Sequence, residues 1–319
     1  AKSHMDHTQI DSTAEYKPLD HTWAWVQYID TTTETLTGER VVSDVVVDQF
    51  DQVYVVGYYD SPSEIGTTAV INHHNDNLKF EPGYTWDDTN ESTVFVSKFT
   101  DQGRCVWTET SRAVNVDTES QKLQIKDGSL YVMCVADKLN FQSSTVAPDL
   151  SGVCINKLDC DNGNVTKAIS FDNNKQTPEP TPGWNMTVTD FKVTDHNMII
   201  ITGTCNARGL VSDNITFTNK FAVDSTDKVI GYAAFIPTFM QTGELSYAIN
   251  KTSTDDTPVV LNGSAIDYTT GLNNIIGTAH NWTAGQSIEA GFGSPSDKIT
   301  INHDTNYLNN TQFILTHEL

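Results

Sequence analysis

Short runs of β-branched and aromatic residues recur along this chain, and clusters of Asp, Asn, Gly and Thr separate them. Apolar residues at the three- and four-residue spacing of an amphipathic helix are nearly absent. Apolar runs of this length, bounded by turn-forming residues, are typical of β-strands. The pattern therefore predicts an all-β chain.

Four segments of the chain align with one another, and each reads as a strand, a polar turn and a second strand. They cover residues 45–57, 123–134, 191–203 and 265–277. The second strand ends in a small residue every time, at Gly57, Cys134, Gly203 and Gly277. A small side chain at a fixed repeat position predicts a close approach between neighbouring repeat units.

A further pair of strands precedes each hairpin, as in residues 94–99 and 105–108. The repeat is therefore a four-stranded meander, and opening strands near residues 93, 153, 233 and 312 predict a four-bladed β-propeller. The first repeat lacks its opening strand, because the chain enters at residues 22–28, which match the strand at 105–108. Residues 312–316 supply the missing strand, and their pairing with the N-terminal blade would close the ring.

The repeat sets the expected domain boundaries. Residues 1–20 are expected to form an N-terminal tail, which begins with a sequence that resembles a cloning remnant, and residues 21–319 a single propeller. The expected blades cover residues 22–92 plus 311–319, 93–151, 152–230 and 231–310. Compact propeller repeats need about 40 to 50 residues, so insertions are expected in polar loops. The candidate insertions are residues 60–92, 137–151, 172–183, 206–230 and 281–309.

Residues 43–58 read Ser-Asp-Val-Val-Val-Asp-Gln-Phe-Asp-Gln-Val-Tyr-Val-Val-Gly-Tyr. This run resembles the SBBP-type β-propeller repeat, whose pattern is Asp, an aliphatic run, Asp, a turn and Val-Tyr-Val-x-Gly. Cys134 replaces the glycine in the second copy and Asn274 the tyrosine in the fourth. The resemblance implies a propeller of a kind found in cell-surface, secreted and virion-associated proteins, and it does not decide function.

The formal net charge of −22, from 41 acidic and 19 basic residues, makes the surface repel phosphate backbones and anionic membranes. No run approaches the roughly 18 apolar residues of a membrane-spanning helix. These features argue against nucleic acid and membrane insertion, and they leave a protein or a glycan as the expected partner.

The five cysteines form no CxxC pair and none of the paired spacings of zinc sites, which favours buried apolar side chains over metal ligands. Sequons for N-glycosylation are frequent and fit a glycoprotein, with an extracellular or virion surface favoured over the cytoplasm. They lie at Asn90, Asn164, Asn185, Asn214, Asn250, Asn262, Asn281 and Asn309.

No motif in the chain identifies a catalytic centre or a cofactor site. Asp159 and Asp161 have the alternating oxygen ligands of a Ca²⁺ loop, but the bidentate Glu is absent and the repeat places them in a hairpin turn. Ca²⁺ is therefore only a weak candidate. No Ser, His and Asp set has the context of a nucleophile elbow, and the abundance of carboxylates makes any one pair uninformative.

Trp86, Trp184 and Trp282 lie in or beside the expected insertions, where an aromatic ring next to Asn or Asp can stack on a sugar or anchor a protein contact. They are the candidate binding residues, although packing is the commoner role of such residues. The sequence thus favours a non-enzymatic recognition or structural module. The alternative is a glycan-processing hydrolase or lyase acting at the mouth of the propeller channel.

Overall fold

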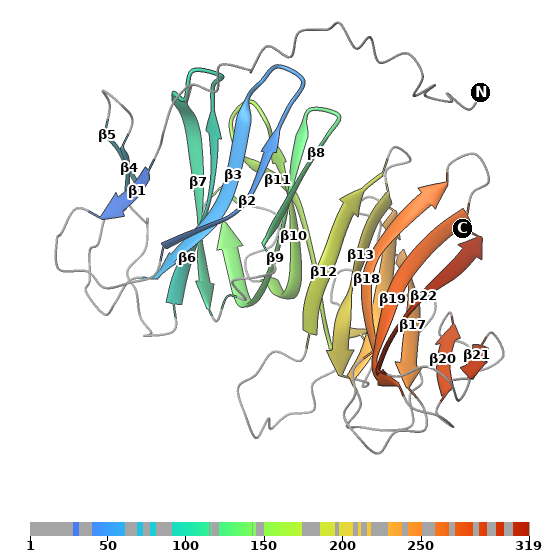
Figure 1. The fold of residues 1–319 in the computed structure, drawn as a ribbon. Helices are drawn as coiled ribbons and strands as arrows, with labels where there is room; N and C mark the ends of the chain where they lie inside the picture. Colours follow the sequence, from blue (N-terminus) through green and yellow to red (C-terminus); the bar gives the residue numbers. More distant parts are fainter. Residues whose placement is uncertain are drawn as a thin grey trace, which may run out of the picture.

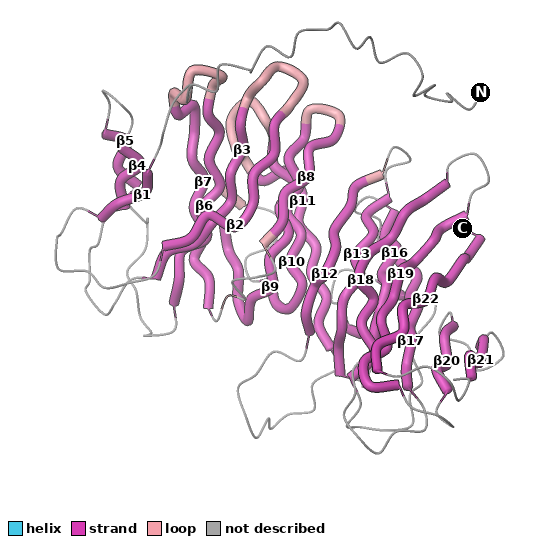
Figure 2. Tube along the Cα trace, in the orientation of Figure 1, coloured by secondary structure: helices cyan, strands magenta, loops and turns pink. Residues whose placement is uncertain are grey.

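A computed structural model describes most of the predicted strands. The described residues are 28–31, 40–60, 69–72, 77–80, 91–114, 116, 121–141, 143–144, 150–173, 186–194, 198–206, 210–211, 216–217, 229–237, 242–250, 259–267, 272–282, 287–291, 298–302 and 309–318. Figures 1 and 2 show strands and turns but no helix in these ranges, which confirms the all-β prediction. None of the described residues therefore forms a helix that could cross a bilayer.

Most strands form four antiparallel meanders, which we call units 1 to 4. Unit 1 contains β2 (Arg40–Val47), β3 (Val53–Asp60), β6 (Glu91–Phe99) and β7 (Cys105–Val114). Unit 2 contains β8 (Lys122–Lys126), β9 (Ser129–Phe141), β10 (Leu150–Asp159) and β11 (Val165–Asn173). Unit 3 contains β12 (Met186–Val193), β13 (Met198–Asn206), β16 (Val229–Pro237) and β17 (Thr242–Asn250). Unit 4 contains β18 (Val259–Asp267), β19 (Leu272–Trp282) and β22 (Asn309–Glu318).

The four predicted hairpins are confirmed as β2–β3, β8–β9, β12–β13 and β18–β19. Each hairpin forms the first two strands of a unit. The strand that was predicted to open the next blade pairs instead with the hairpin that precedes it in the sequence. The pairings β3–β6, β9–β10 and β13–β16 therefore cross the expected blade boundaries at 92/93, 151/152 and 230/231. The end of β7 also pairs with the end of β9, which joins units 1 and 2 in one continuous sheet.

The expected insertions are not loops throughout, which corrects the prediction made from their polar composition. Short strands occur within three of them, where backbone pairing supplies hydrogen bonds that a polar sequence alone does not reveal. These strands are β4 (Ala69–Asn72), β5 (Asn77–Phe80), β14 (Leu210–Val211), β15 (Thr216–Phe217), β20 (Ser287–Gly291) and β21 (Lys298–Asn302). β1 (Tyr28–Thr31) pairs with β4.

The core consists of three apolar layers between consecutive units. One cluster joins units 1 and 2 and includes Tyr54, Val96 and Leu130. A second joins units 2 and 3, and a third joins units 3 and 4. The first strands β2, β8, β12 and β18 also contact one another in this order, so the hairpin edges of the four units follow a common line. In Figure 1 unit 1 lies at the left and units 3 and 4 at the right.

The atoms nearest to the three glycines at the ends of the second strands belong to the same unit, so these glycines mark a close approach within a unit, whereas Cys134 lies in the core between units 1 and 2. Each of the three glycines lies directly opposite an aromatic residue, in the pairs Gly57–Phe95, Gly203–Tyr232 and Gly277–Phe313. A Cβ atom on Gly277 would lie 2.2 Å from the Phe313 ring. Gly277 is therefore required by the aromatic ring opposite it, whereas the atom nearest to a Cβ on Gly57 or Gly203 would be a carbonyl oxygen of the first strand, that of Val41 or Thr187. In unit 2 the same place holds the pair Cys134–Cys154.

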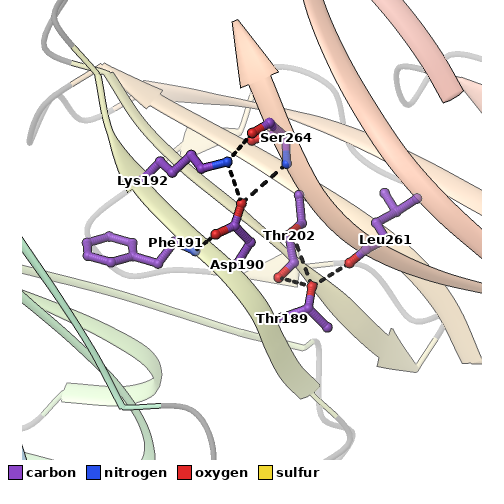
Figure 3. Close-up of polar contacts among 7 residues, drawn as sticks. All are labelled: Thr189, Asp190, Phe191, Lys192, Thr202, Leu261 and Ser264. Atoms are coloured by element: carbon purple, nitrogen blue, oxygen red, sulfur yellow. Dashed lines mark hydrogen bonds and ion pairs between the residues drawn. The ribbon is translucent and has the colours of Figure 1, made fainter. Parts of the chain in front are cut away.

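A β-bulge in β12, the first strand of unit 3, places an aspartate against β18, the first strand of unit 4. Asp190 follows the bulge in β12, and its Oδ1 accepts a hydrogen bond from the Phe191 amide at 3.0 Å. Its Oδ2 accepts one from the Ser264 amide in β18 at 3.3 Å and lies 2.9 Å from the Lys192 ammonium (Figure 3). Lys192 also donates to the Ser264 carbonyl, so the carboxylate and the ammonium clamp β12 to β18.

Asp44 repeats this arrangement between units 1 and 2. It follows the bulge in β2, and its Oδ1 accepts from the Val45 amide at 2.9 Å. Its Oδ2 accepts from the Leu123 amide in β8 at 2.8 Å. The two aspartates therefore act as equivalent clamps, one between units 1 and 2 and one between units 3 and 4.

The expected ring closure falls partly outside the described residues. Residues 312–316 lie in β22 as predicted, and β22 pairs with β19. The N-terminal strand expected to pair with them lies at residues 22–28, of which only Tyr28 is described. The number of blades and the closure of the ring stay predictions.

Candidate functional site

The sequence-predicted binding residues are not brought together in the described part of the chain. Trp86 and Trp184 lie outside the described residues. Trp282 ends β19, where its backbone pairs with Asn309, and its side chain is not described. The structure instead directs attention to the turn end of units 1 and 2.

Three hairpin turns converge there around a pocket of about 690 Å³, which we call the turn pocket. The turns join β2 to β3, β8 to β9 and β10 to β11, and they appear as loops at the top of Figure 2. Its lining residues are Val47, Asp48, Gln49, Phe50, Gln52, Tyr54, Lys98, Ile125, Lys126, Asp127, Gly128, Cys160 and Asp161. The volume falls within the range of small-molecule sites.

Asp48 organises the first turn. Its Oδ1 accepts hydrogen bonds from the backbone amides of Phe50 at 2.8 Å and Gln52 at 3.0 Å. Asp51 adopts a positive φ of 59°, a conformation that Asp tolerates better than most residues. The turn is thereby fixed with the Phe50 ring directed outward, and Phe50 is 70% exposed. An exposed phenyl group on a rigid turn is a preformed contact surface.

The second turn is the Asp-Gly pair that the sequence indicates. Asp127 and Gly128 both have positive φ, at 49° and 69°, as a two-residue type I′ hairpin requires. Both residues are exposed. Because the backbone conformation is set by this turn type, the Asp127 carboxylate is presented to the pocket by a short and constrained loop.

The third turn contains the weak Ca²⁺ candidates. Asp159 Oδ1 accepts from the Asp161 amide at 2.7 Å, and the Gly163 amide donates to the Asp159 carbonyl at 2.9 Å. The turn thus uses Asp159 to bond its own backbone, as the hairpin interpretation predicts. No cluster of three or more His, Cys, Asp or Glu side chains with metal-binding geometry occurs among the described residues.

A partly buried hydrogen-bond network connects several residues of the pocket lining. Lys98 Nζ donates to the Cys160 carbonyl at 2.9 Å and lies 5.4 Å from the centre of the Tyr54 ring, within cation–π range. Trp107 Nε1 donates to the same carbonyl at 3.0 Å. Tyr54 donates from its hydroxyl to Asp48 Oδ2 at 3.1 Å. This network holds the first and third turns at a fixed separation.

Burial keeps the Tyr54 phenol and the Cys160 thiol protonated. Burial is the main cause that raises the pKa of Tyr54 far above its ordinary value, so the phenol stays a donor. Burial likewise raises the pKa of the Cys160 thiol. A thiol with a raised pKa is a poor nucleophile at neutral pH. The described lining therefore favours binding over covalent chemistry.

Reasoning from sequence missed Phe50, Lys98 and Asp127 as pocket residues. Phe50 carried one usable signal, because it is a large aromatic residue inside an otherwise polar turn. Lys98 carried none, since its partner Cys160 is 62 positions away in the sequence. Trp107 packs against the core of units 1 and 2.

Comparisons with known proteins found no matching family model, no matching curated protein and no matching solved structure. The resemblance of residues 43–58 to the SBBP-type repeat therefore stays a prediction.

Proposed function

We propose that this chain is a four-bladed β-propeller that acts as a non-enzymatic recognition module and binds glycans at the turn pocket. The consecutive contacts of β2, β8, β12 and β18 support the propeller, because the first strands of propeller blades surround a common axis. In this proposal residues 22–28 add a fourth strand to unit 4 beside β22. That strand would give unit 4 the same four-stranded form as units 1 to 3.

The observation that carries the glycan proposal is the combination of an exposed ring with both acceptors and donors. Sugar hydroxyl groups donate to carboxylates and accept from ammonium groups. The turn pocket offers Asp127 and Asp161 as acceptors and Lys98 and Lys126 as donors. The apolar C–H face of a pyranose ring can pack on Phe50. A strongly anionic ligand fits less well, because the net charge of −22 repels it.

A glycan array followed by calorimetric titration with the best sugar tests the proposal. Phe50→Ala should lower the affinity for that sugar at least about tenfold, which is the loss of about 1.4 kcal/mol of contact energy. Asp127→Asn should lower it less, because the amide keeps one acceptor. Val106→Ala is the matched control, since Val106 is also an exposed apolar residue of unit 1 but does not line the pocket.

The outcomes separate the partner classes. Equal affinities for the wild-type protein and the Phe50→Ala variant would reject the turn pocket as the sugar site. Binding to a protein and to no glycan would replace the glycan by a protein partner. Release of shorter sugars during incubation with oligosaccharides would support the alternative of a hydrolase or lyase. An extracellular or virion surface location and glycosylation of the sequons stay predictions.

A further inference from the structure

Unit 2 departs from the other three units at one pair of facing positions. The other units hold a glycine directly opposite an aromatic residue, in the pairs Gly57–Phe95, Gly203–Tyr232 and Gly277–Phe313. Unit 2 instead holds Cys134 in β9 directly opposite Cys154 in β10. Since both members of the pair differ from the repeat, and both are cysteine, one cause should explain the two positions together.

The two cysteines lie on the face of unit 2 that packs against unit 1. Both belong to the core between units 1 and 2, whereas Met133 and Ile155 beside them belong to the core between units 2 and 3. The equivalent residues of units 3 and 4 have the same orientation, because Tyr232 lies in the core between units 2 and 3 and Phe313 packs against the core between units 3 and 4. Each of these faces is therefore turned toward the preceding unit.

The register of β9 and β10 brings the two cysteine side chains within reach of a covalent bond. Directly opposite residues of an antiparallel pair have Cα atoms about 4.5 or 5.5 Å apart, depending on whether their backbones are hydrogen-bonded to each other. A disulfide bond spans about 4.4 to 6.8 Å between Cα atoms. Facing side chains also lie on the same side of the sheet. The two strands thus have the separation that a Cys134–Cys154 bond requires.

The other cysteines have no such partner. Cys105 lies opposite Phe99, and Cys205 lies between Met186 and Ile230 on the neighbouring strands. All five cysteines are free thiols in this structure, and the Cys154 thiol donates to the Gly152 carbonyl with 3.5 Å between sulfur and oxygen. A disulfide bond would replace only this weak hydrogen bond. The structure therefore shows the reduced form of the pair.

We infer that Cys134 and Cys154 form a disulfide bond that ties β9 to β10 when the chain folds in an oxidising compartment. The step is a thiol–disulfide exchange with a small disulfide such as oxidised glutathione. One cysteine thiolate attacks the oxidised glutathione and releases a glutathione thiolate, and the second cysteine then displaces the other glutathione. Two protons and two electrons leave with two molecules of reduced glutathione, and one sulfur–sulfur bond forms for the one that breaks.

Burial determines when this bond can form. Both cysteines are 0% exposed, and burial raises the pKa of Cys134 to about 12. The thiolate is the attacking species, so the folded protein reacts slowly at neutral pH. The unfolded chain exposes both thiols to the oxidant. The bond therefore forms during folding, and unit 1 then covers it against reductants.

Refolding with oxidised glutathione, compared with refolding in excess reduced glutathione, tests the inference. Mass spectrometry of the oxidised sample, alkylated after denaturation, should show peptides linked through Cys134 and Cys154 and three alkylated cysteines in place of five. The thermal unfolding midpoint of this sample should be higher by about 5 °C, because the bond restricts the unfolded chain. Five alkylated cysteines would overturn the inference, and so would a bond between any other two.

Two single variants separate the bond from ordinary packing. Cys134→Ala should abolish the difference in midpoint between the oxidised and reduced samples. Cys205→Ala is the matched control, because Cys205 is equally buried in a strand but faces no cysteine, and it should keep the difference. An equal difference in both variants would contradict the assignment. The peptide map of the unchanged chain gives an answer even if a substitution prevents folding.

This bond depends neither on the proposed propeller nor on the proposed ligand. Disulfide bonds persist at cell and virion surfaces, which is the location that the sequence favours. Linked peptides without sugar binding would reject only the glycan proposal. Sugar binding by a chain that keeps five free thiols after oxidative refolding would reject only the disulfide bond.

Discussion

Glu109 in β7 is a partly buried acid whose carboxylate bonds to the segment after β9. Its Oε1 accepts a hydrogen bond from the Ser143 amide at 2.7 Å, which ties the segment after β9 to β7. Burial raises the pKa of this carboxyl group above its ordinary value of 4.5, and the hydrogen bonds from Ser143 only partly oppose that effect. The folded state therefore holds the Glu109 proton more tightly than the unfolded state does.

This shift has a defined consequence for stability. As pH rises from 4.5 through the higher pKa of the folded state, the folded protein must lose a proton that it binds more tightly, so the free energy of unfolding falls. Glu109→Gln removes this titration and keeps an acceptor for Ser143. We expect the variant to gain stability relative to wild type across that range, measured by urea unfolding at several pH values. A difference that does not change with pH would contradict the raised pKa.

At the scale of the element, a glycine directly opposite an aromatic residue recurs in units 1, 3 and 4. A Cβ on Gly277 would have its three nearest neighbours all in the Phe313 ring, the closest at 2.2 Å. A Cβ on Gly203 would instead meet the Thr187 carbonyl oxygen at 1.8 Å, and backbone cannot yield as a side chain can. The bulge in β12 between Val188 and Asp190 brings this carbonyl close.

The loss of stability at the two glycines should therefore respond differently when the facing aromatic ring is also removed. Gly277→Ala and Gly203→Ala should each cost about 1 to 3 kcal/mol or more by overpacking. Adding Phe313→Ala should recover much of the first loss, because the ring is the obstacle. Adding Tyr232→Ala should recover little of the second. Double-mutant cycles from chemical unfolding measure both coupling energies, and equal couplings would contradict this assignment.

The sequence predicted the hairpins well because their turn chemistry and apolar runs are local. Asp127-Gly128 sets its turn by itself, and the strands at residues 94–99 and 153–158 were found within a few residues of their ends. The boundaries of the units were not predictable from the sequence, because they depend on which neighbouring strand each strand pairs with. The aromatic partners of the glycines were equally hidden, because Gly57 and Phe95 meet only across a sheet.

The candidate site was predictable only in part. Asp48 and Asp127 follow from the turn signals, but their convergence depends on the packing of unit 1 against unit 2. The tryptophan-based expectation rested on residue type and on the position of the tryptophans in or beside the expected insertions. In the proposed function Phe50 takes the role expected of those tryptophans, and the hydrogen bonds that Asp48 accepts hold its turn in place.

For the whole molecule the dominant feature is its negative charge. A net charge of −22 disfavours a compact state through self-repulsion, and dissolved salt screens that repulsion. The screening length falls from about 30 Å at 0.01 M to about 3 Å at 1 M ionic strength. We therefore expect the thermal unfolding midpoint to rise with NaCl over this range, as followed by circular dichroism.

The control for this prediction is the identity of the cation. KCl should act like NaCl at equal ionic strength, because screening does not depend on which monovalent ion is present. CaCl₂ should add nothing beyond its ionic strength if Asp159 serves its own turn. A rise at micromolar Ca²⁺ would instead show a specific site and would revive the weak candidates Asp159 and Asp161.

The common polarity of the units also bears on where the chain can be interrupted. Because every unit turns the same face toward its predecessor, the packing itself does not distinguish a first unit from a last one. If unit 4 packs on unit 1, the two ends of the chain interrupt a closed ring of repeats. A circular permutant that joins the two ends of this chain and opens the link between β11 and β12 would then present the same succession of interfaces. Several orders of the four units along the chain would then give the same fold.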